Sequence, residues 1–183
     1  MKVFARLLPL YLMIFVLPAA CGTKAPADEL EAIKYSGRIS VGTSADAPPF
    51  ESLDADGQIV GFDIDLVNEI GKRMGVAVEI QNLPYEYLMP AVQGRKINIA
   101  IAAFNVNGEP NQNIGFTDAY FVLEDGMAAV PRTNRPEIKN GPLAIAVPEG
   151  AVELTKALNM TIADMLADGF IEDLSQKHLL ISP

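Results

Sequence analysis

The stretch GFDIDLVNEIGKRMG, residues 61–75, carries the pattern that decides the fold. Its apolar side chains recur at the three- and four-residue spacing of one helix face: Ile64, Leu66, Val67 and Ile70. Asp63 stands at the start of this pattern, where a side chain can cap a helix, and Gly75 stands at its end, where glycine commonly terminates one. The pattern predicts an amphipathic helix from about residue 63 to residue 74.

Strand patterns lie on both sides of this helix. Residues 38–43 (RISVGT) alternate and are rich in β-forming side chains, and residues 76–80 follow the helix as a second strand. A second helix is predicted over residues 85–93, and a continuous apolar run of strand length occupies residues 97–103. Strands and helices that alternate at these spacings indicate parallel βαβ units. The predicted fold class is therefore α/β, with a mostly parallel sheet and helices on both faces.

Further elements fit the same class. An Asp-Gly pair, Asp56 and Gly57, predicts a hairpin that joins residues 50–52 to residues 58–60. Two strands and two helices are predicted in the last third of the chain: residues 127–130 and 143–147, and residues 151–167 and 171–178.

Composition and charge exclude several classes of protein. The 183 residues are 50% apolar and 20% charged, which is ordinary for a globular domain and rules out a disordered or collagen-like chain. With 14 Lys and Arg against 23 Asp and Glu, the net charge is −9, and such a surface repels phosphate backbones, so no nucleic-acid partner is expected. The single cysteine allows no internal disulfide, and the single histidine, His178, argues against a histidine-based metal site or catalytic triad. No metal, cofactor or catalytic set is expected.

The first twenty residues have the features of an export signal. Lys2 and Arg6 precede an apolar run over residues 7–17, which is too short to cross a bilayer as a helix of about 20 residues. The sole cysteine, Cys21, follows in an arrangement that resembles the lipobox of bacterial lipoproteins, although Pro18 stands where that motif prefers leucine.

These features predict a division of the chain into three parts. Residues 1–20 are expected to be a signal peptide, residues 21–35 a lipid-anchored tether that begins at the lipidated Cys21, and residues 36–183 the folded body. Cleavage near residue 20 with an unmodified cysteine is the alternative.

Five stretches of the body resemble one family in order: residues 41–51 (VGTSADAPPFE), 61–75, 88–102 (LMPAVQGRKINIAIA), 115–121 (GFTDAYF) and 143–174. They are similar to the extracytoplasmic solute-binding proteins of ABC importers for polar amino acids, which have the type II periplasmic binding protein fold. The resemblance implies a protein of two lobes that close on a solute. Here only residues 131–142 separate the outgoing strand from the returning one, so the second lobe is expected to be missing.

The sequence also departs from the family at the binding pocket. The resemblance implies an arginine in a T-x-x-R motif that grips the carboxylate of the solute, but Asn107 and Pro110 stand at these two positions. The family often stacks an aromatic side chain on the solute at the place of Ala47. Tight binding of a free amino acid is therefore not expected.

The remaining site is expected at the carboxyl ends of the strands, where doubly wound sheets bind their ligands. Six candidate ligand-binding residues follow from this placement: Asp46, Phe50, Tyr85, Phe104, Asn105 and Asn107. Without a second lobe the site is open, so we expect amino acids to bind no tighter than about millimolar. A neutral polar solute or a protein partner fits this altered pocket better.

The function expected from these features is that of a non-catalytic, membrane-anchored lipoprotein outside the cytoplasm, related to amino-acid import. Its expected partners are a small polar solute, an ABC permease or another lipoprotein, and the membrane through its lipid anchor. The alternatives are a single-lobe module for protein–protein interaction and a degenerate remnant that binds no ligand.

Overall fold

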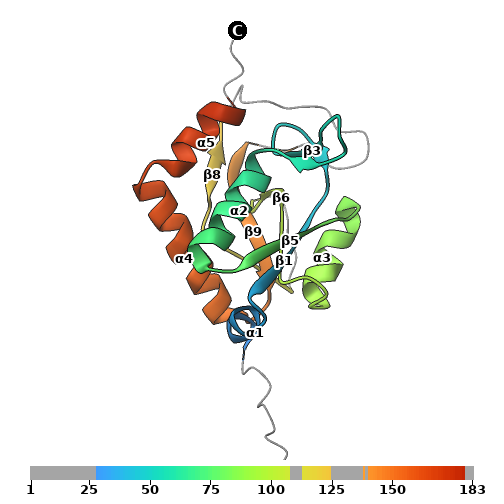
Figure 1. Ribbon diagram of the computed structural model, residues 1–183, viewed down its shortest axis with the longest axis vertical. Coiled ribbons are helices and arrows are strands. Elements are labelled where there is room, and N and C mark those ends of the chain that lie inside the picture. Colours follow the sequence, from blue (N-terminus) through green and yellow to red (C-terminus); the bar gives the residue numbers. More distant parts are fainter. Residues whose placement is uncertain (1–27, 108–112, 125–137, 139, 180–183) are drawn as a thin grey trace, which may run out of the picture.

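The structure is a computed structural model that describes residues 28–107, 113–124, 138 and 140–179. These residues form one lobe in which a central sheet is covered by helices (Figure 1). Five helices are present in the described residues: α1 (Glu29–Ser36), α2 (Phe62–Met74), α3 (Tyr85–Gln93), α4 (Val152–Ala167) and α5 (Phe170–His178). The strands there are β1 (Arg38–Thr43), β2 (Asp46–Ala47), β3 (Glu51–Leu53), β4 (Ile59–Val60), β5 (Ala77–Asn82), β6 (Ile99–Asn105), β7 (Ile114–Phe116), β8 (Phe121–Leu123) and β9 (Gly141–Pro148).

The central sheet is mixed. Its strand order is β5-β1-β6-β9-β7, with β8 also paired to β9. Strand β1 pairs with β5 and β6 in parallel, as the βαβ pattern predicted, whereas β9 runs antiparallel to β6, β7 and β8. The single-lobe α/β fold is confirmed, and its parallel part is the half that contains β5, β1 and β6. The β2-β3-β4 hairpin sheet is separate and includes the predicted turn at Gly57.

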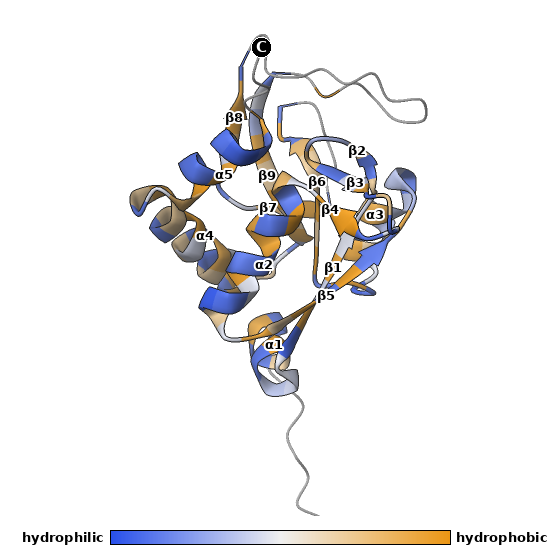
Figure 2. Ribbon diagram, turned by 45° about the horizontal axis from the view of Figure 1, so that its top comes forward, coloured by the Kyte–Doolittle hydropathy of each residue, from blue (hydrophilic) through white to orange (hydrophobic). Residues whose placement is uncertain are grey.

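Alternating side chains of the sheet divide the core into two layers. From β6, Ile99 and Ile101 enter the layer under α1, α2, α4 and α5, while Ala100, Ala102 and Phe104 enter the layer under α3. Figure 1 shows this arrangement, with α4 and α5 on one side of the sheet and α3 on the other. In Figure 2 the central strands carry much of the orange, whereas much of α5 is blue, as expected for buried strands and a helix that is partly exposed. All seven residues of β6 are buried, as expected for a strand covered on both faces.

Helix α2 ends where predicted and begins one residue earlier, but the predicted side-chain cap is absent. Its C-terminus at Gly75 is confirmed, since Gly75 adopts the left-handed conformation (φ 71°) and its N–H donates to carbonyls of the last turn. The residue before its first turn is Gly61, and no side chain caps the N-terminus there. The prediction that Asp63 caps the helix is wrong, because Asp63 is completely buried and bonds to residues outside α2.

The folded body begins earlier than the sequence suggested. Residues 29–35, assigned above to the tether, belong to α1, whose Ile33 is buried in the core. Asp28 caps this helix by accepting a hydrogen bond from the Glu31 N–H at 2.9 Å. Glu29 fastens α1 to the sheet, because its carboxylate accepts hydrogen bonds from Arg95 at 2.5 Å and Asn98 at 2.6 Å. The expected signal peptide and Cys21 lie outside the described residues.

The region of the expected lobe deletion is partly described. Residues 127–130, predicted as the outgoing strand, lie outside the described residues, whereas the returning strand is confirmed as β9. Strand β8, which the sequence did not predict, precedes this region and pairs with the start of β9, with Leu123 opposite Gly141. The chain therefore enters and leaves this region at neighbouring points of one sheet.

The C-terminal helix α5 is fastened to α2 through one carboxylate. Asp65 Oδ2 lies 2.7 Å from both Lys177 Nζ and His178 Nε2. Burial alone would raise the pKa of the Asp65 carboxyl, but the hydrogen bonds and charges of Lys177 and His178 outweigh it and hold this pKa below its ordinary value. Within the described ranges, no helix combines the length and the apolar character that crossing a bilayer requires.

Candidate functional site

The candidate site lies at the edge where the parallel strands β1, β5 and β6 end. Backbone and side-chain hydrogen bonds hold two of the loops at this edge together. The Leu83 N–H donates to the Thr43 carbonyl at 2.8 Å, and the Ala45 N–H donates to Asn82 Oδ1 at 3.0 Å. The loop after β1, which leads to Asp46, is thereby fixed against the loop that leads from β5 to Tyr85. The predicted placement of these two loops at one edge is confirmed.

Asp46 presents an exposed carboxylate at this edge. It begins the short strand β2, whose pairing with β3 fixes the backbone. Ser44 Oγ donates to Asp46 Oδ1 at 3.1 Å and orients the carboxylate. An exposed, oriented carboxylate at a strand end can accept hydrogen bonds from an ammonium or guanidinium group.

Tyr85 supplies an aromatic surface at the same edge of the sheet. It is the first residue of α3 and is half-buried, and its ring packs on Phe104 with the centroids 5.6 Å apart. Phe104 itself is 1% exposed and belongs to the core layer under α3. Tyr85 can therefore contact a solute, whereas Phe104 supports the ring from behind.

Phe50 does not belong to the site surface. Its side chain is completely buried in the opposite core layer, where it packs edge-on against Phe62 with centroids 6.0 Å apart. The sequence placed Phe50 near a strand end but could not tell on which side of the backbone it packs. We therefore remove it from the candidate site.

The two asparagines shape the loop after β6. Asn105 is buried, its Nδ2 donates to the Asn140 carbonyl at 3.0 Å, and its Oδ1 accepts from the Asn107 N–H at 2.9 Å. A Cβ at Gly141 would lie 2.8 Å from Asn105 Nδ2, so the glycine leaves room for this contact. Asn105 therefore holds the loop to β9, while Asn107 is exposed and can reach a solute.

The polar residue that organises this edge is Asp63, which the sequence assigned to a helix cap. Asp63 Oδ2 accepts from the Ala103 N–H at 2.7 Å, and Oδ1 accepts from the Tyr120 hydroxyl at 2.8 Å. Ala103 has a φ of 46°, a conformation that is uncommon for any residue except glycine. The buried carboxylate thus joins α2 to the strained end of β6 and to the segment that contains Tyr120.

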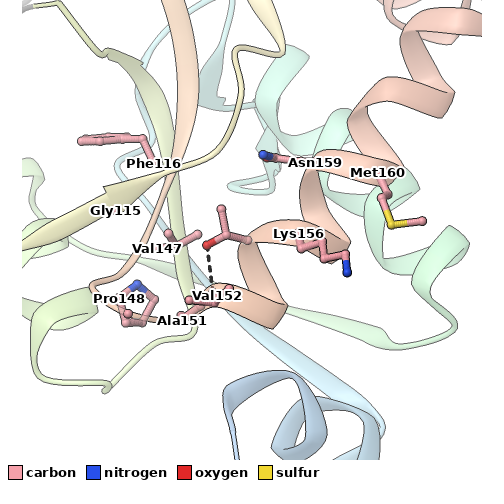
Figure 3. Close-up of a pocket in the computed structure, with 11 residues that line it drawn as sticks. Gly115, Phe116, Val147, Pro148, Ala151, Val152, Lys156, Asn159 and Met160 are labelled. Carbon is pink, nitrogen blue, oxygen red and sulfur yellow. Dashed lines mark hydrogen bonds between the residues drawn. The ribbon is translucent and has the colours of Figure 1, made fainter.

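One of the hollows in the described part of the chain lies away from this edge. It is a groove of about 440 Å³ between α4 and the β7 side of the sheet, next to the end of β9. Figure 3 shows Gly115 and Val147 at the sheet side and Lys156 and Met160 projecting from α4. Sequence analysis named none of these residues individually.

Known proteins resemble the chain over most of its length. The family model of bacterial extracellular solute-binding proteins, family 3, matches residues 39–181. The chain belongs to this family. Its sequence is 30% identical over 140 residues to the arginine-binding protein ArgT of Corynebacterium glutamicum, an alignment that covers 76% of this chain and 46% of ArgT. The chain thus spans about half the length of this relative, as expected for a single lobe.

Solved structures also resemble the chain, and one of them is a single domain. The arginine-bound form of domain 1 from TmArgBP is 33% identical, with a TM-score of 0.61, and the match covers 72% of this chain and 96% of that domain. An ancestral cyclohexadienyl dehydratase is 20% identical with a TM-score of 0.71, over 85% of this chain and 98% of that one. The second likeness shows the fold alone.

The chemistry available at this edge is that of binding. Asp46, Tyr85 and Asn107 are accessible there, and they offer a charged acceptor, an aromatic face and an amide. Within residues 28–107, 113–124 and 140–179, no cluster of three His, Cys, Asp or Glu side chains is placed to hold a metal ion.

Proposed function

We propose that the chain is a non-catalytic, extracytoplasmic binding lobe that holds an amino acid with a cationic side chain and works with an ABC permease. The observation that carries this proposal is the exposed Asp46 carboxylate in the loop fastened to the loop of Tyr85. The family supports it too, because ArgT is an arginine-binding protein and domain 1 from TmArgBP has an arginine-bound form.

The residues favour recognition of the side chain of the solute over its carboxylate. A guanidinium or ammonium group pairs with a carboxylate and stacks on an aromatic ring, and Asp46 and Tyr85 offer both contacts. Proline at position 110 supplies no cation for the solute carboxylate. The cationic end of the solute therefore contributes most of the affinity. This proposal replaces the neutral solute that the altered motif suggested.

We predict that arginine binds with a dissociation constant of about 1 mM, which corresponds to roughly −4 kcal/mol, because an open edge buries little of the solute. Asp46→Asn and Tyr85→Ala are each expected to weaken binding about fivefold, the value of roughly 1 kcal/mol for an exposed ionic or cation–π contact. The affinities are measured by titrating arginine while the backbone amide signals are followed by NMR.

Tyr87→Ala is the matched control for this titration. Tyr87 lies two residues further along α3 and is 59% exposed, so its removal should leave the affinity unchanged. Glutamine should bind more weakly than arginine, because it lacks the charge. If no amino acid changes the amide signals at concentrations up to tens of millimolar, the proposal is wrong. An unchanged affinity for arginine in both Asp46→Asn and Tyr85→Ala would also contradict it.

We further propose that Cys21 is acylated and holds the lobe at the membrane. The charged start, the short apolar run and the single cysteine that follows support this assignment. Two or more acyl chains anchor a protein stably, whereas one chain does so only marginally. Cys21→Ser is therefore expected to move the protein from the membrane fraction to the soluble fraction, as measured by immunoblotting after ultracentrifugation. Thr23→Ser is the control, and unchanged fractionation of Cys21→Ser would contradict the lipid anchor.

A further inference from the structure

Strand β6 contains a bulge directly before the candidate site. Its register with β9 shifts between Ala100 and Phe104, so that three residues of β6, 101–103, stand opposite one residue of β9, Ile145. The N–H and C=O groups of Ile145 both bond to Thr117, which follows β7 on the other side of β9, at 3.0 Å each. Bulges are common next to functional sites, where they redirect a side chain.

A buried carboxylate holds the last residue of this bulge, Ala103. Ala103 has a φ of 46°, a conformation that persists in a residue with a side chain only when the surrounding structure imposes it. Its N–H donates to Oδ2 of Asp63 at 2.7 Å, and Asp63 is completely buried in the first turn of α2. Strand β6 contacts both α2 and α3, which lie on opposite faces of the sheet (Figure 1). The carboxylate therefore imposes the conformation of the bulge from the α2 side.

The bulge determines where the side chain of Phe104 lies. Successive residues of a strand point to opposite faces, so Phe104 enters the core layer under α3, whereas Ala103 faces the layer under α2. The Phe104 ring is 1% exposed and packs on the ring of Tyr85, with the centroids 5.6 Å apart. A change in the conformation of Ala103 would therefore move the ring that supports Tyr85.

We propose that Asp63 is a positioning residue of the candidate site, which acts through the bulge and the Phe104 ring to hold the ring of Tyr85 in place for the solute. The inference rests on the proposed function, in which Tyr85 stacks on the cationic end of the solute. Asp63 itself is completely buried and does not reach the solute. Its contribution is preorganisation, because a ring that is already held in place loses less conformational freedom when the solute binds.

Replacing Asp63 is expected to weaken arginine binding although the residues that contact the solute are unchanged. Asp63→Ala should raise the dissociation constant about fivefold, as much as Tyr85→Ala, because both variants lose the aromatic contact. Asp63→Asn should raise it about twofold, since a neutral amide still accepts the Ala103 N–H but forms a weaker hydrogen bond than a carboxylate does. The full chain is titrated with arginine, and the affinity is taken from the NMR signals of the folded protein.

A double-mutant cycle tests the route through Tyr85. Asp63→Ala combined with Tyr85→Ala should bind arginine as tightly as Tyr85→Ala alone, because both changes remove the same contact. Asp63→Ala combined with Asp46→Asn should weaken binding about twenty-five-fold, since the two changes remove independent contacts and their effects multiply. The same two combinations are made with Asp63→Asn, which retains an acceptor and is available if the alanine variant does not fold.

Tyr120→Phe is the matched control for this role of Asp63. It removes the hydrogen bond that the Tyr120 hydroxyl donates to Asp63 Oδ1 at 2.8 Å but leaves the bond from Ala103 to Oδ2 in place. Its affinity for arginine should therefore equal that of the unmodified chain, even though the variant is less stable. A residue that only stabilised the fold would give no such difference between its two hydrogen bonds.

Nuclear Overhauser effects between the rings of Tyr85 and Phe104 give a readout that needs no solute. They should weaken in Asp63→Ala and, to a smaller degree, in Asp63→Asn, and they should persist in Tyr120→Phe. If the unmodified chain binds no amino acid, the proposed function is wrong, and these ring contacts alone decide the role of Asp63. The proposal is overturned if the ring contacts persist in every Asp63 variant that folds. An affinity loss that adds in full to that of Tyr85→Ala overturns it as well.

Discussion

Replacing Gly61 with alanine is expected to lower the free energy of unfolding by about 4 kcal/mol, which is a large part of the stability of a small domain. Gly61 has a φ of 138°, a conformation that side chains rarely allow. A Cβ there would collide with the Phe50 carbonyl oxygen and lie 2.9 Å from the Pro49 carbonyl oxygen. Neither oxygen can move away freely, because they accept the N–H groups of Asp63 and Phe62 at 3.0 Å. Urea unfolding followed by circular dichroism measures the loss.

Gly75→Ala at the other end of α2 is the matched control. Gly75 also has a positive φ, of 71°, but a Cβ there meets nothing within 4 Å. Its replacement should therefore cost only the conformational penalty, about 1 kcal/mol. Equal losses in the two variants would contradict the assigned collision at Gly61.

Replacing Asp63 with alanine is expected to lower the free energy of unfolding by about 3 kcal/mol. The change removes the acceptor of two buried donors, the Tyr120 hydroxyl and the Ala103 N–H, and a buried donor without a partner costs about 1 to 3 kcal/mol. Asp63→Asn keeps one carbonyl acceptor and should lose less than the alanine variant. The same urea titration measures both.

Asp65→Ala is the control that distinguishes the loss of a buried carboxylate from the loss of a negative charge in the first turn of α2. Asp65 lies two residues further along α2 and pairs with Lys177 and His178 at a partly exposed position, so its loss should cost about 1 kcal/mol, less than the loss of Asp63. Tyr120→Phe should cost about 1 kcal/mol, since it removes one of the two bonds of Asp63. A loss in Asp63→Ala no larger than in Asp65→Ala would refute the role assigned to Asp63.

The elements with strong local signals were predictable. Helix α3 has the predicted bounds, and β1 has the predicted six residues. The periodic spacing of the apolar side chains and a glycine next to one end mark each of these elements in the sequence. Strands β7 and β8 have three residues each and exist through their pairing with β9, which no local pattern reveals. Helix α1 was missed because only Leu30 and Ile33 mark its apolar face.

The candidate site was predictable in position but not in composition. The rule that ligands meet the carboxyl ends of parallel strands placed Asp46, Tyr85 and Asn107 at one edge. The sequence could not separate them from Phe50 and Phe104, because the same aromatic residues near strand ends serve as core or as surface. The role of Asp63 was hidden for a related reason, since its partners lie 40 and 57 residues away while its neighbours resemble a helix cap.

The pairing of Leu123 with Gly141 holds the end of β8 next to the start of β9. Because the two strand ends are held side by side by the sheet itself, the length of chain between them matters little to the lobe. Each doubling of a flexible connection costs only about 0.6 kcal/mol of closure entropy. We therefore expect the lobe to fold with connections of very different length at this position, including one long enough to form a separate domain. The same position is suited to grafting a fluorescent reporter onto the lobe.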